Sequence, residues 1–255
     1  MNKTALITGS TSGLGFEFVK LFANQGYNLV IVARNKNKLI EIKDSYKNIQ
    51  VTPIVKDLSL PGAAKEVYDE IENQNIKIDV LINNAGFGLL GNFSDLDIER
   101  QNEMIQLNVT ALTELTYYVL GDMKKRNSGK ILNVASTAAF QPGPFMAVYY
   151  ATKAFVLSFS EALVEEVSDF NITVTTLCPG ATKTNFGALA KVENTKMFKR
   201  AMNSETVAKM GVDALMKGKR VIITGGFNKF GALSAKFLPR SVAAKVAKYV
   251  AKETN

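Results

Sequence analysis

The chain has no histidine and only one cysteine among its 255 residues. Without histidine, Ser-His-Asp and Cys-His nucleophilic triads and histidine metal sites are excluded. The single cysteine, Cys178, cannot form a disulfide within the chain and leaves too few soft ligands for zinc, so we predict no metal site. Acid–base chemistry near neutral pH then falls to a tyrosine, a lysine or a carboxylate with a shifted pKa.

Long apolar runs and proline-rich stretches are also missing. No apolar run reaches the roughly 18 residues that a membrane-spanning helix needs. Met1 leads directly into an apolar strand pattern rather than a signal peptide, so we expect a cytoplasmic protein. Six prolines are too few for a linker, and 47% of the residues are hydrophobic. We therefore predict a single domain over residues 1–255 with a well-buried core.

Short apolar strands alternate with helical patterns along the chain, and the longest helical region is predicted from 95 to 124. This alternation predicts an α/β fold, a Rossmann-like three-layer sandwich with a seven-stranded parallel sheet. Ligands of such a sheet bind outside the carboxyl ends of its strands, where the polar motifs of this chain lie. The predicted strands are 4–8, 28–32, 51–55, 80–82, 130–134, 171–177 and 220–223.

A glycine-rich turn joins the first predicted strand to the first predicted helix. Glycines let the backbone come close to an anion, and the N–H groups and dipole of the following helix hold a phosphate. The spacing G-x-x-x-G-x-G differs from the commoner dinucleotide fingerprint, so a plain strand-to-helix turn is the alternative. The residues of the turn are Gly9, Ser10, Thr11, Ser12, Gly13, Leu14 and Gly15.

The second predicted strand ends in a basic residue. An acid near this position would bond the ribose 2′-hydroxyl of NAD, whereas an arginine suits a 2′-phosphate. The acid is missing and Arg34 is present. This predicts NADP(H), with an ordinary surface charge as the alternative.

Tyr149 and Lys153 are four residues apart in a helical pattern and therefore share one helix face. Tyr150 points about 100° away. A phenol keeps its proton up to about pH 10, but a nearby ammonium favours the phenolate and lowers that pKa. The pair is a candidate general acid–base, although Y-x-x-x-K by itself is more often part of an ordinary amphipathic helix.

Six motifs in this order resemble those of the short-chain dehydrogenase/reductase family, and the resemblance covers residues 3–223. Past residue 223, the segments 226–229 and 238–240 resemble a subgroup that includes ketoacyl and steroid reductases, which favours a hydrophobic substrate. The six are T-G-x-x-x-G-x-G at 8–15, N-N-A-G at 83–86, Asn108, Ser136, Y-x-x-x-K at 149–153 and P-G-x-x-x-T at 179–184.

The resemblance implies roles for the matching residues. Ser136 and Tyr149 bind the substrate carbonyl, and Tyr149 gives it a proton as hydride arrives from the nicotinamide. Lys153 lowers the pKa of Tyr149 and holds the nicotinamide ribose, while Asn108 keeps a water in the proton relay. Besides the glycine turn and Arg34, the implied cofactor contacts are Asp57, Leu58, Asn84, Ala85, Gly86, Tyr149, Lys153, Pro179, Gly180, Thr182 and Thr184.

These roles imply an NADPH-dependent enzyme that reduces an apolar ketone, aldehyde or 3-oxoacyl group to an alcohol. A non-catalytic nucleotide-sensing or scaffold protein that keeps the fold is the alternative. Residues 185–204 are expected to cover the substrate, with simple helix-face packing equally open. Family members commonly pair through their long helices, so the resemblance also implies a homodimer or homotetramer.

Positive charge gathers at the C-terminal end. From Lys183 onward the chain has 15 Lys/Arg against four Asp/Glu. The basic residues alternate with apolar ones at helical spacing, so we expect solvated helix faces rather than a nucleic-acid site. For residues 226–255 we predict a basic helical extension. It either docks on the protein and covers the substrate site, or makes a weak peripheral contact with an anionic membrane surface.

Overall fold

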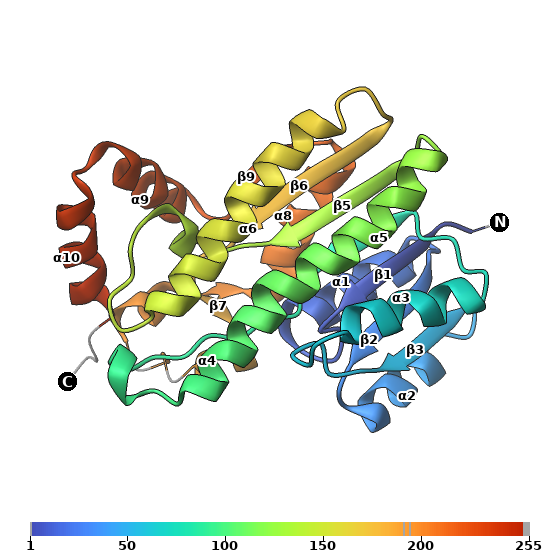
Figure 1. Ribbon diagram of the computed structural model, residues 1–255, viewed down its shortest axis with the longest axis horizontal. Coiled ribbons are helices and arrows are strands. Elements are labelled where there is room, and N and C mark those ends of the chain that lie inside the picture. The colour runs from blue at the N-terminus through green and yellow to red at the C-terminus, as the bar shows by residue number, and fades with distance from the viewer. Residues whose placement is uncertain (1, 191, 194, 252–255) are drawn as a thin grey trace.

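The computed structural model describes residues 2–190, 192–193 and 195–251 (Figure 1). Seven strands form a parallel sheet in the order β3-β2-β1-β4-β5-β6-β9, which confirms the predicted fold class. The strand order reverses beside β1, and this is where doubly wound sheets open a crevice for ligands. The strands are β1 (Thr4–Thr8), β2 (Asn28–Ala33), β3 (Val51–Val55), β4 (Val80–Asn83), β5 (Gly129–Val134), β6 (Ile172–Cys178) and β9 (Val221–Ile223).

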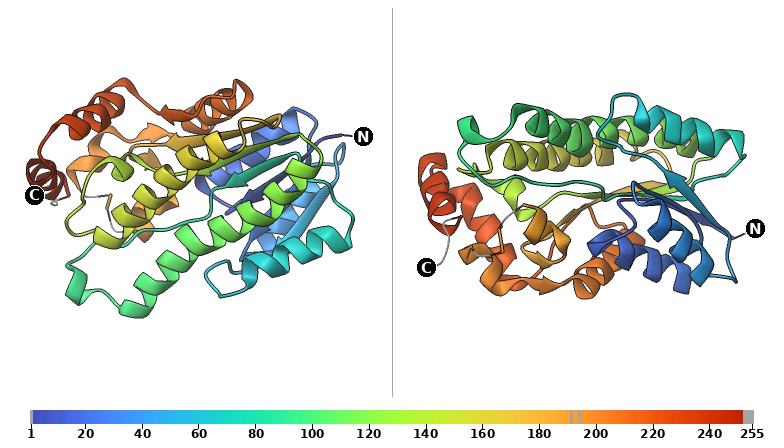
Figure 2. Two further views of the ribbon diagram at one scale, coloured as in Figure 1. Left: turned by 45° about the horizontal axis from the view of Figure 1, so that its top comes forward. Right: turned by 90° about the horizontal axis from the view of Figure 1, so that it is seen from below.

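Helices cover both faces of the sheet (Figure 2). One face carries α1 (Gly13–Asn24), α2 (Lys36–Ser45) and α8 (Ser204–Met216). The other carries α3 (Ala63–Asn73), α5 (Leu112–Lys125) and α6 (Ala147–Glu166).

Strand β1 is buried from both sides, as a strand in the middle of a parallel sheet should be. Ala5 and Ile7 belong to the core beneath α1, α2 and α8, whereas Leu6 belongs to the core beneath α3 and α5. Successive side chains of a strand point to opposite faces, which explains this division. Phe18 and Phe22 of α1 are fully buried, and each stabilises the fold by about 1.5–3 kcal/mol.

The helical region predicted from 95 to 124 is interrupted, and this corrects the sequence expectation. A 3-10 turn η1 (Phe93–Asp95) precedes α4 (Ile98–Ile105), and a π-helical turn η2 (Gln106–Ala111) separates α4 from α5. Asp97 caps the N-terminus of α4, where its side chain accepts a hydrogen bond from the Glu99 N–H at 2.8 Å. The π-helical turn contains Asn108, and single π turns are often found at functional sites.

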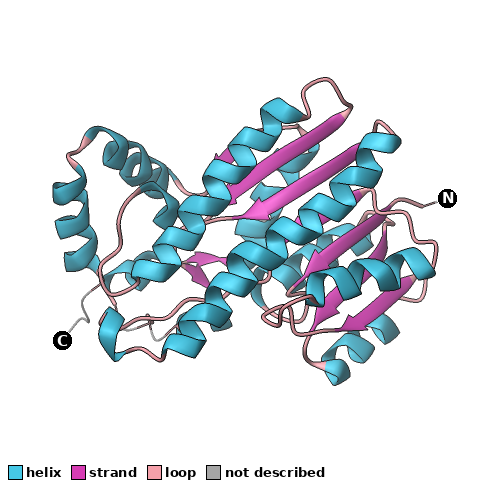
Figure 3. Ribbon diagram, viewed as in Figure 1, coloured by secondary structure: helices cyan, strands magenta, loops and turns pink. Residues whose placement is uncertain are grey.

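The segments that follow β6 and β9 lie past the carboxyl ends of these strands (Figure 1). Strands β7 (Thr182–Lys183) and β8 (Met202–Asn203) pair as a small parallel sheet that the sequence did not predict (Figure 3). Between them, the region expected to cover the substrate contains α7 (Asn185–Leu189) and the 3-10 turn η4 (Lys196–Arg200).

The C-terminal extension forms two helices, α9 (Gly226–Phe237) and α10 (Arg240–Val250), and its last residues, 252–255, lie outside the described residues. Both helices lie beyond the carboxyl ends of the strands, far from the N-terminus (Figure 1). Among the described residues, no helix is long and apolar enough to cross a membrane.

Candidate active site

The turn after β1 leaves its backbone open to a ligand. Gly9 has a φ of 65° and Gly13 a φ of 51°, in the left-handed region that glycine adopts without strain. A Cβ on Gly15 would lie 2.0 Å from the carbonyl oxygen of Gly9, so no side chain fits there. The first turn of α1 has no acidic residue, and the Ser12 side chain makes no cap hydrogen bond. Such a helix start binds a phosphate through its free N–H groups.

Thr8 and Asn84 fix the shape of this turn. The Thr8 hydroxyl accepts hydrogen bonds from the N–H groups of Asn84 and Ala85, each at 3.0 Å. The Asn84 side chain donates to the Thr8 carbonyl at 2.9 Å, so it holds the turn from behind. Thr8 was not among the predicted site residues, although its place at the head of the T-G motif was the available signal.

Ser136, Tyr149 and Lys153 meet beyond the end of β5. Ser136 caps the 3-10 turn η3 (Thr137–Phe140), where its hydroxyl accepts a hydrogen bond from the Ala138 N–H at 3.1 Å. Tyr149 lies in the first turn of α6, and the interaction of its hydroxyl group with the Ser136 side chain lowers its pKa. The Lys153 ammonium donates to the Val134 carbonyl at 2.8 Å and lies 5.9 Å from the centre of the Tyr149 ring.

The electrostatics of Tyr149 differ from the sequence prediction. Burial raises the pKa of Tyr149 above its ordinary value, and this outweighs the lowering by the Ser136 hydrogen bond. The expected lowering by Lys153 is therefore not observed, because desolvation disfavours a phenolate in this enclosed site. Tyr149 keeps its proton at neutral pH. That is the state a proton donor requires.

Lys153 is shifted in the opposite direction. Its side chain is buried, and burial lowers its pKa from 10.5 to about 8. A desolvated ammonium is the less favoured form, yet this value leaves Lys153 mainly charged at neutral pH. The structure thus holds a charged lysine close to the carboxyl end of β5, and among the described residues its hydrogen-bond acceptor is the Val134 carbonyl oxygen.

The side chain of Asn108 is fully engaged in holding the site together. Its Oδ1 accepts from the Phe87 N–H at 3.1 Å, and its Nδ2 donates to the Phe87 carbonyl at 3.0 Å and to the Thr152 hydroxyl at 3.1 Å. Thr152 in turn donates to the Tyr149 carbonyl at 2.7 Å. Asn108 therefore links the segment after β4 to α6.

A cavity of about 880 Å³ runs from the glycine turn past Tyr149 to the C-terminal helices. Most of the predicted site residues line it. Three predicted residues do not line it. The buried Ser10 hydroxyl donates a hydrogen bond to the Val32 carbonyl, Gly15 packs against the Gly9 carbonyl, and the Asn108 side chain is hydrogen-bonded to Phe87. Those that line it are Gly9, Thr11, Ser12, Gly13, Leu14, Arg34, Asp57, Leu58, Asn84, Ala85, Gly86, Ser136, Tyr149, Lys153, Pro179, Gly180, Thr182 and Thr184.

Arg34 and Asp57 face each other at one end of the cavity. The Arg34 guanidinium lies 3.6 Å from the Asp57 carboxylate, and 69% of the Arg34 side chain is exposed. Burial alone would raise the pKa of Asp57, but hydrogen bonds from Ser59 and the charge of Arg34 hold it below its usual value. Lys56 also lines this end and pairs with Glu66 at 2.6 Å. Ser59 and Lys56 were not predicted, since neither lies in a recognised motif.

Along the path from the glycine turn to the C-terminal helices, apolar groups pack against the Tyr149 ring. The Phe186 ring centre lies 5.4 Å from that of Tyr149. A Cβ on Gly88 would come within 3.0–3.2 Å of Phe186, Tyr149 and Met146. Of these neighbours, only Phe186 was predicted, as part of the segment 185–204.

Comparisons with known proteins agree with this geometry. A family model described as short chain dehydrogenase matches residues 3–194. The very-long-chain 3-oxoacyl-CoA reductase of Laccaria bicolor is 36% identical over 178 residues, which are 67% of this chain and 52% of that protein. The 17-beta-hydroxysteroid dehydrogenase type 3 of Mus musculus is 33% identical over 206 residues, 79% of this chain and 66% of that protein.

A solved structure shows the same similarity in three dimensions. A short-chain dehydrogenase from Sphingobium yanoikuyae in complex with NADPH superimposes with a TM-score of 0.80 at 30% identity, covering 91% of this chain and 92% of that one. The two curated relatives are longer, and the chain spans only about half to two thirds of their lengths. The chain belongs to the short-chain dehydrogenase/reductase family, of the ketoacyl/steroid reductase type, whose members are oxidoreductases that act on CH–OH or C=O groups with a nicotinamide cofactor.

Proposed function

We propose that the protein is an NADPH-dependent reductase of apolar ketones, aldehydes or 3-oxoacyl compounds. The observation that carries the proposal is a buried, protonated Tyr149 that shares with Ser136 the wall of a cavity that begins at the glycine turn. A nucleotide-sensing or scaffold protein would have no use for this proton donor. The relatives' names, 3-oxoacyl-CoA reductase and hydroxysteroid dehydrogenase, support a carbonyl on an apolar compound.

The residues of the chain fit a nicotinamide dinucleotide. The glycine turn and the start of α1 would hold its phosphates, and Arg34 and Asp57 would lie at its adenosine end. When bound, the cofactor supplies a hydride to the carbonyl carbon. Tyr149 gives its hydroxyl proton to the carbonyl oxygen, and the Ser136 hydroxyl orients that oxygen by a hydrogen bond. Positioned donors of this kind stabilise the negative charge that develops on the oxygen.

The proposal is tested by adding NADPH and a panel of apolar ketones and aldehydes and following the loss of NADPH absorbance. Turnover of any member supports a reductase. Tight NADPH binding without turnover on a broad panel would favour the nucleotide-sensing or scaffold protein instead.

Replacement of Arg34 by alanine should remove the preference for NADPH over NADH. The guanidinium can pair with a 2′-phosphate, and hydrogen bonds to charged groups contribute about 1.5–3 kcal/mol, so NADPH binding should weaken roughly 10- to 100-fold. NADH binding should change little. Binding constants for both cofactors, measured by fluorescence titration, check this result.

Arg220→Ala is the matched control, because Arg220 is similarly exposed (65%) and also pairs with a carboxylate, that of Glu165. This variant should bind both cofactors like the wild type. Equal affinity of the wild-type protein for NADPH and NADH would show that Arg34 does not select the cofactor.

We also propose that the chain forms a homo-oligomer through its long helices. Ile98 and Ile105 of α4, Tyr117 of α5 and Phe155 of α6 are exposed by 40–74%, although all are apolar or aromatic. Burial of such side chains in a symmetric interface would stabilise an assembly. Light scattering should give a mass well above the 27.8 kDa of one chain.

A further inference from the structure

The cavity wall beyond Tyr149 is apolar and is built from two distant parts of the chain. One part is the segment between β7 and β8, and the other is the pair of C-terminal helices. The first part supplies Phe186, Leu189, Val192 and Phe198, and the second supplies Phe227, Val246, Tyr249 and Val250. An apolar chain or ring system attached to the reacting carbonyl would be bound by this wall.

Two cations stand in this apolar wall. Lys196 and Arg200, at the two ends of η4, both line the cavity. The Lys196 ammonium lies 3.6 Å from the ring centre of Tyr249, and the Arg200 guanidinium lies 4.5 Å from that of Phe227. Aromatic faces attract cations in this arrangement and hold them in place. The rings come from α10 and α9, so the cations bridge the two parts of the wall.

These cations differ from three other cations on the cavity wall, and they share the lack of a carboxylate partner with Lys153 alone among the described cavity residues. Arg34, Lys56 and Arg100 have carboxylate partners in Asp57, Glu66 and Glu103. Within the described residues, no carboxylate lies at ion-pair distance from Lys196 or Arg200. An aromatic ring carries no net charge, so it positions a cation without neutralising it. Two uncompensated positive charges are therefore held beside an apolar site.

We propose that the substrate is an anionic amphiphile, whose phosphate or carboxylate binds Lys196 and Arg200 while its apolar part lies on the wall beside Tyr149. This inference rests on the proposed carbonyl reductase function and names the class of compound that the site takes. It also assigns to Lys196 and Arg200 the selection of the substrate. They contact rings of α10 and α9, whereas the neighbours of Gly9 and Gly13 in the glycine turn are Asn84, Ala85 and Thr184.

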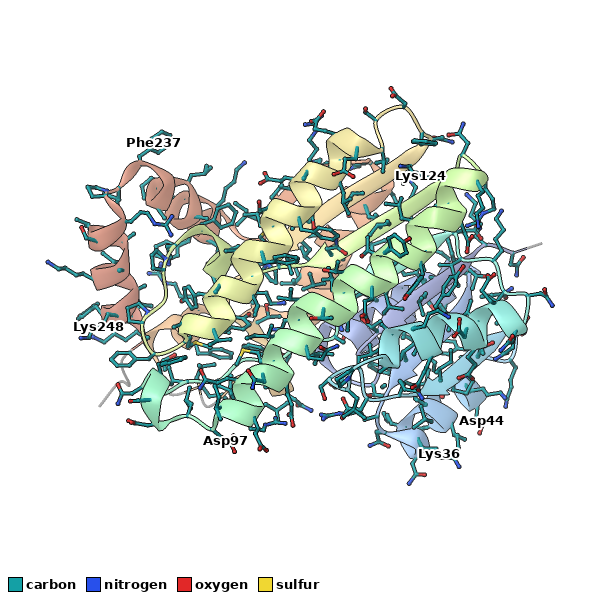
Figure 4. All side chains as sticks on the ribbon, in the orientation of Figure 1. Lys36, Asp44, Asp97, Lys124, Phe237 and Lys248 are labelled. Atoms are coloured by element: carbon teal, nitrogen blue, oxygen red, sulfur yellow. The ribbon has the colours of Figure 1, made fainter. Side chains whose placement is uncertain are left out.

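The anion could be part of a monomeric amphiphile or of a lipid headgroup in a membrane. The outer side of α9 and α10 bears exposed apolar residues, among them Phe237, which is labelled with Lys248 at the edge of the molecule in Figure 4. We commit to the monomeric amphiphile, because Lys196 and Arg200 line the cavity that leads to Tyr149, whereas Phe237 does not.

The first experiment measures binding by calorimetry, with dodecyl phosphate as the probe and dodecanol as its uncharged match. Wild-type protein should bind dodecyl phosphate about 100- to 10,000-fold more tightly than dodecanol, as two charge-assisted contacts would give. The double variant Lys196→Met/Arg200→Met should lose this difference and keep its affinity for dodecanol. Lys209→Met/Lys219→Met removes the same charge from exposed positions outside the cavity, and it should behave like the wild type.

The second experiment measures turnover of an oxo fatty acid with a terminal methyl ketone and of its methyl ester. The acid should have the higher kcat/KM, and the double variant should lower kcat/KM for the acid alone. Equal values for acid and ester, with turnover of both, would overturn the anion site and leave the reductase standing. Selective loss of dodecyl phosphate binding without turnover of either compound would support the anion site and count against the reductase.

Two further results would overturn the inference. One is weaker NADPH binding in the double variant, which would assign Lys196 and Arg200 to the cofactor. The other is a set of two observations. The wild type, but not the double variant, sediments with phosphatidylglycerol vesicles and not with phosphatidylcholine vesicles, and monomeric dodecyl phosphate does not bind. That result would assign the cations to a membrane surface.

Discussion

Replacement of Tyr149 by phenylalanine should lower kcat for carbonyl reduction by about 100- to 10,000-fold, the usual contribution of a positioned general acid. The change removes only the hydroxyl group. The ring should stay in place, because Phe186, Met146 and Gly88 surround it and none of them contacts it through a polar group. Substrate binding should be little affected, so the loss should appear in kcat more than in KM. The measurement is steady-state NADPH oxidation with an active ketone from the panel.

Tyr150→Phe is the matched control for this experiment. Tyr150 is the next residue on α6, its ring centre lies 6.1 Å from that of Tyr149, and it also lines the cavity. Burial raises the pKa of Tyr150 as well, so burial by itself does not distinguish the two phenols. The two phenols differ in their neighbours, since Ser136 affects the pKa of Tyr149 but not that of Tyr150. Tyr150→Phe should keep kcat within about threefold, and an unchanged kcat in Tyr149→Phe would rule out the proposed acid.

The fold could be predicted from the sequence because local pattern and global structure agree over most of the chain. In β1, Thr4–Thr8, every residue is buried, and the glycine turn and α1 follow at the expected positions. The helix face that Tyr149 and Lys153 share could also be predicted, because it depends only on helical spacing. Such features are encoded within a few neighbouring residues, so the sequence alone suffices for them.

Features that depend on distant residues could not be predicted. The π-helical turn at Asn108 is accompanied by hydrogen bonds to Phe87 and Thr152, which lie in other elements. The pKa of Tyr149 depends on how completely the fold buries its ring, and Phe186 contributes to that from a remote segment. Helical spacing placed the Lys153 ammonium near the phenol correctly. It gave no measure of desolvation, which turned out to be the larger effect.

The two cations of the apolar cavity wall, Lys196 and Arg200, could not be predicted from the sequence either. The charge count showed that the C-terminal part is basic, and we expected all lysines and arginines of this part to lie on solvated helix faces. The structure separates Lys196 and Arg200 from the rest, because the rings that hold them come from helices that follow much later in the chain. A sequence pattern of one segment contains no information about such a pairing.

Replacement of Lys153 by methionine should abolish turnover and at the same time stabilise the protein. The pKa of Lys153 is lowered from 10.5 to about 8 by burial, which corresponds to roughly 3 kcal/mol of unfavourable desolvation. Methionine has a similar length without the charge. The lost hydrogen bond to the Val134 carbonyl should offset about 1 kcal/mol, which leaves a net gain of roughly 2 kcal/mol. For a chain of this size the melting temperature at pH 7 should rise by about 4–8 °C.

The pH dependence of the difference in melting temperature tests whether desolvation of Lys153 causes the stabilisation. Below about pH 8 the lysine is protonated in both the folded and the unfolded chain, so the wild type bears the full desolvation energy. Between about pH 8 and 10.5 the unfolded chain binds more protons than the folded one, and wild-type stability relative to the variant rises with pH. The difference in melting temperature should therefore shrink from about pH 7 to about pH 10. Lys217→Met, at an exposed lysine, should show no such change. A difference that stays constant with pH would mean that Lys153 is not desolvated in the folded protein.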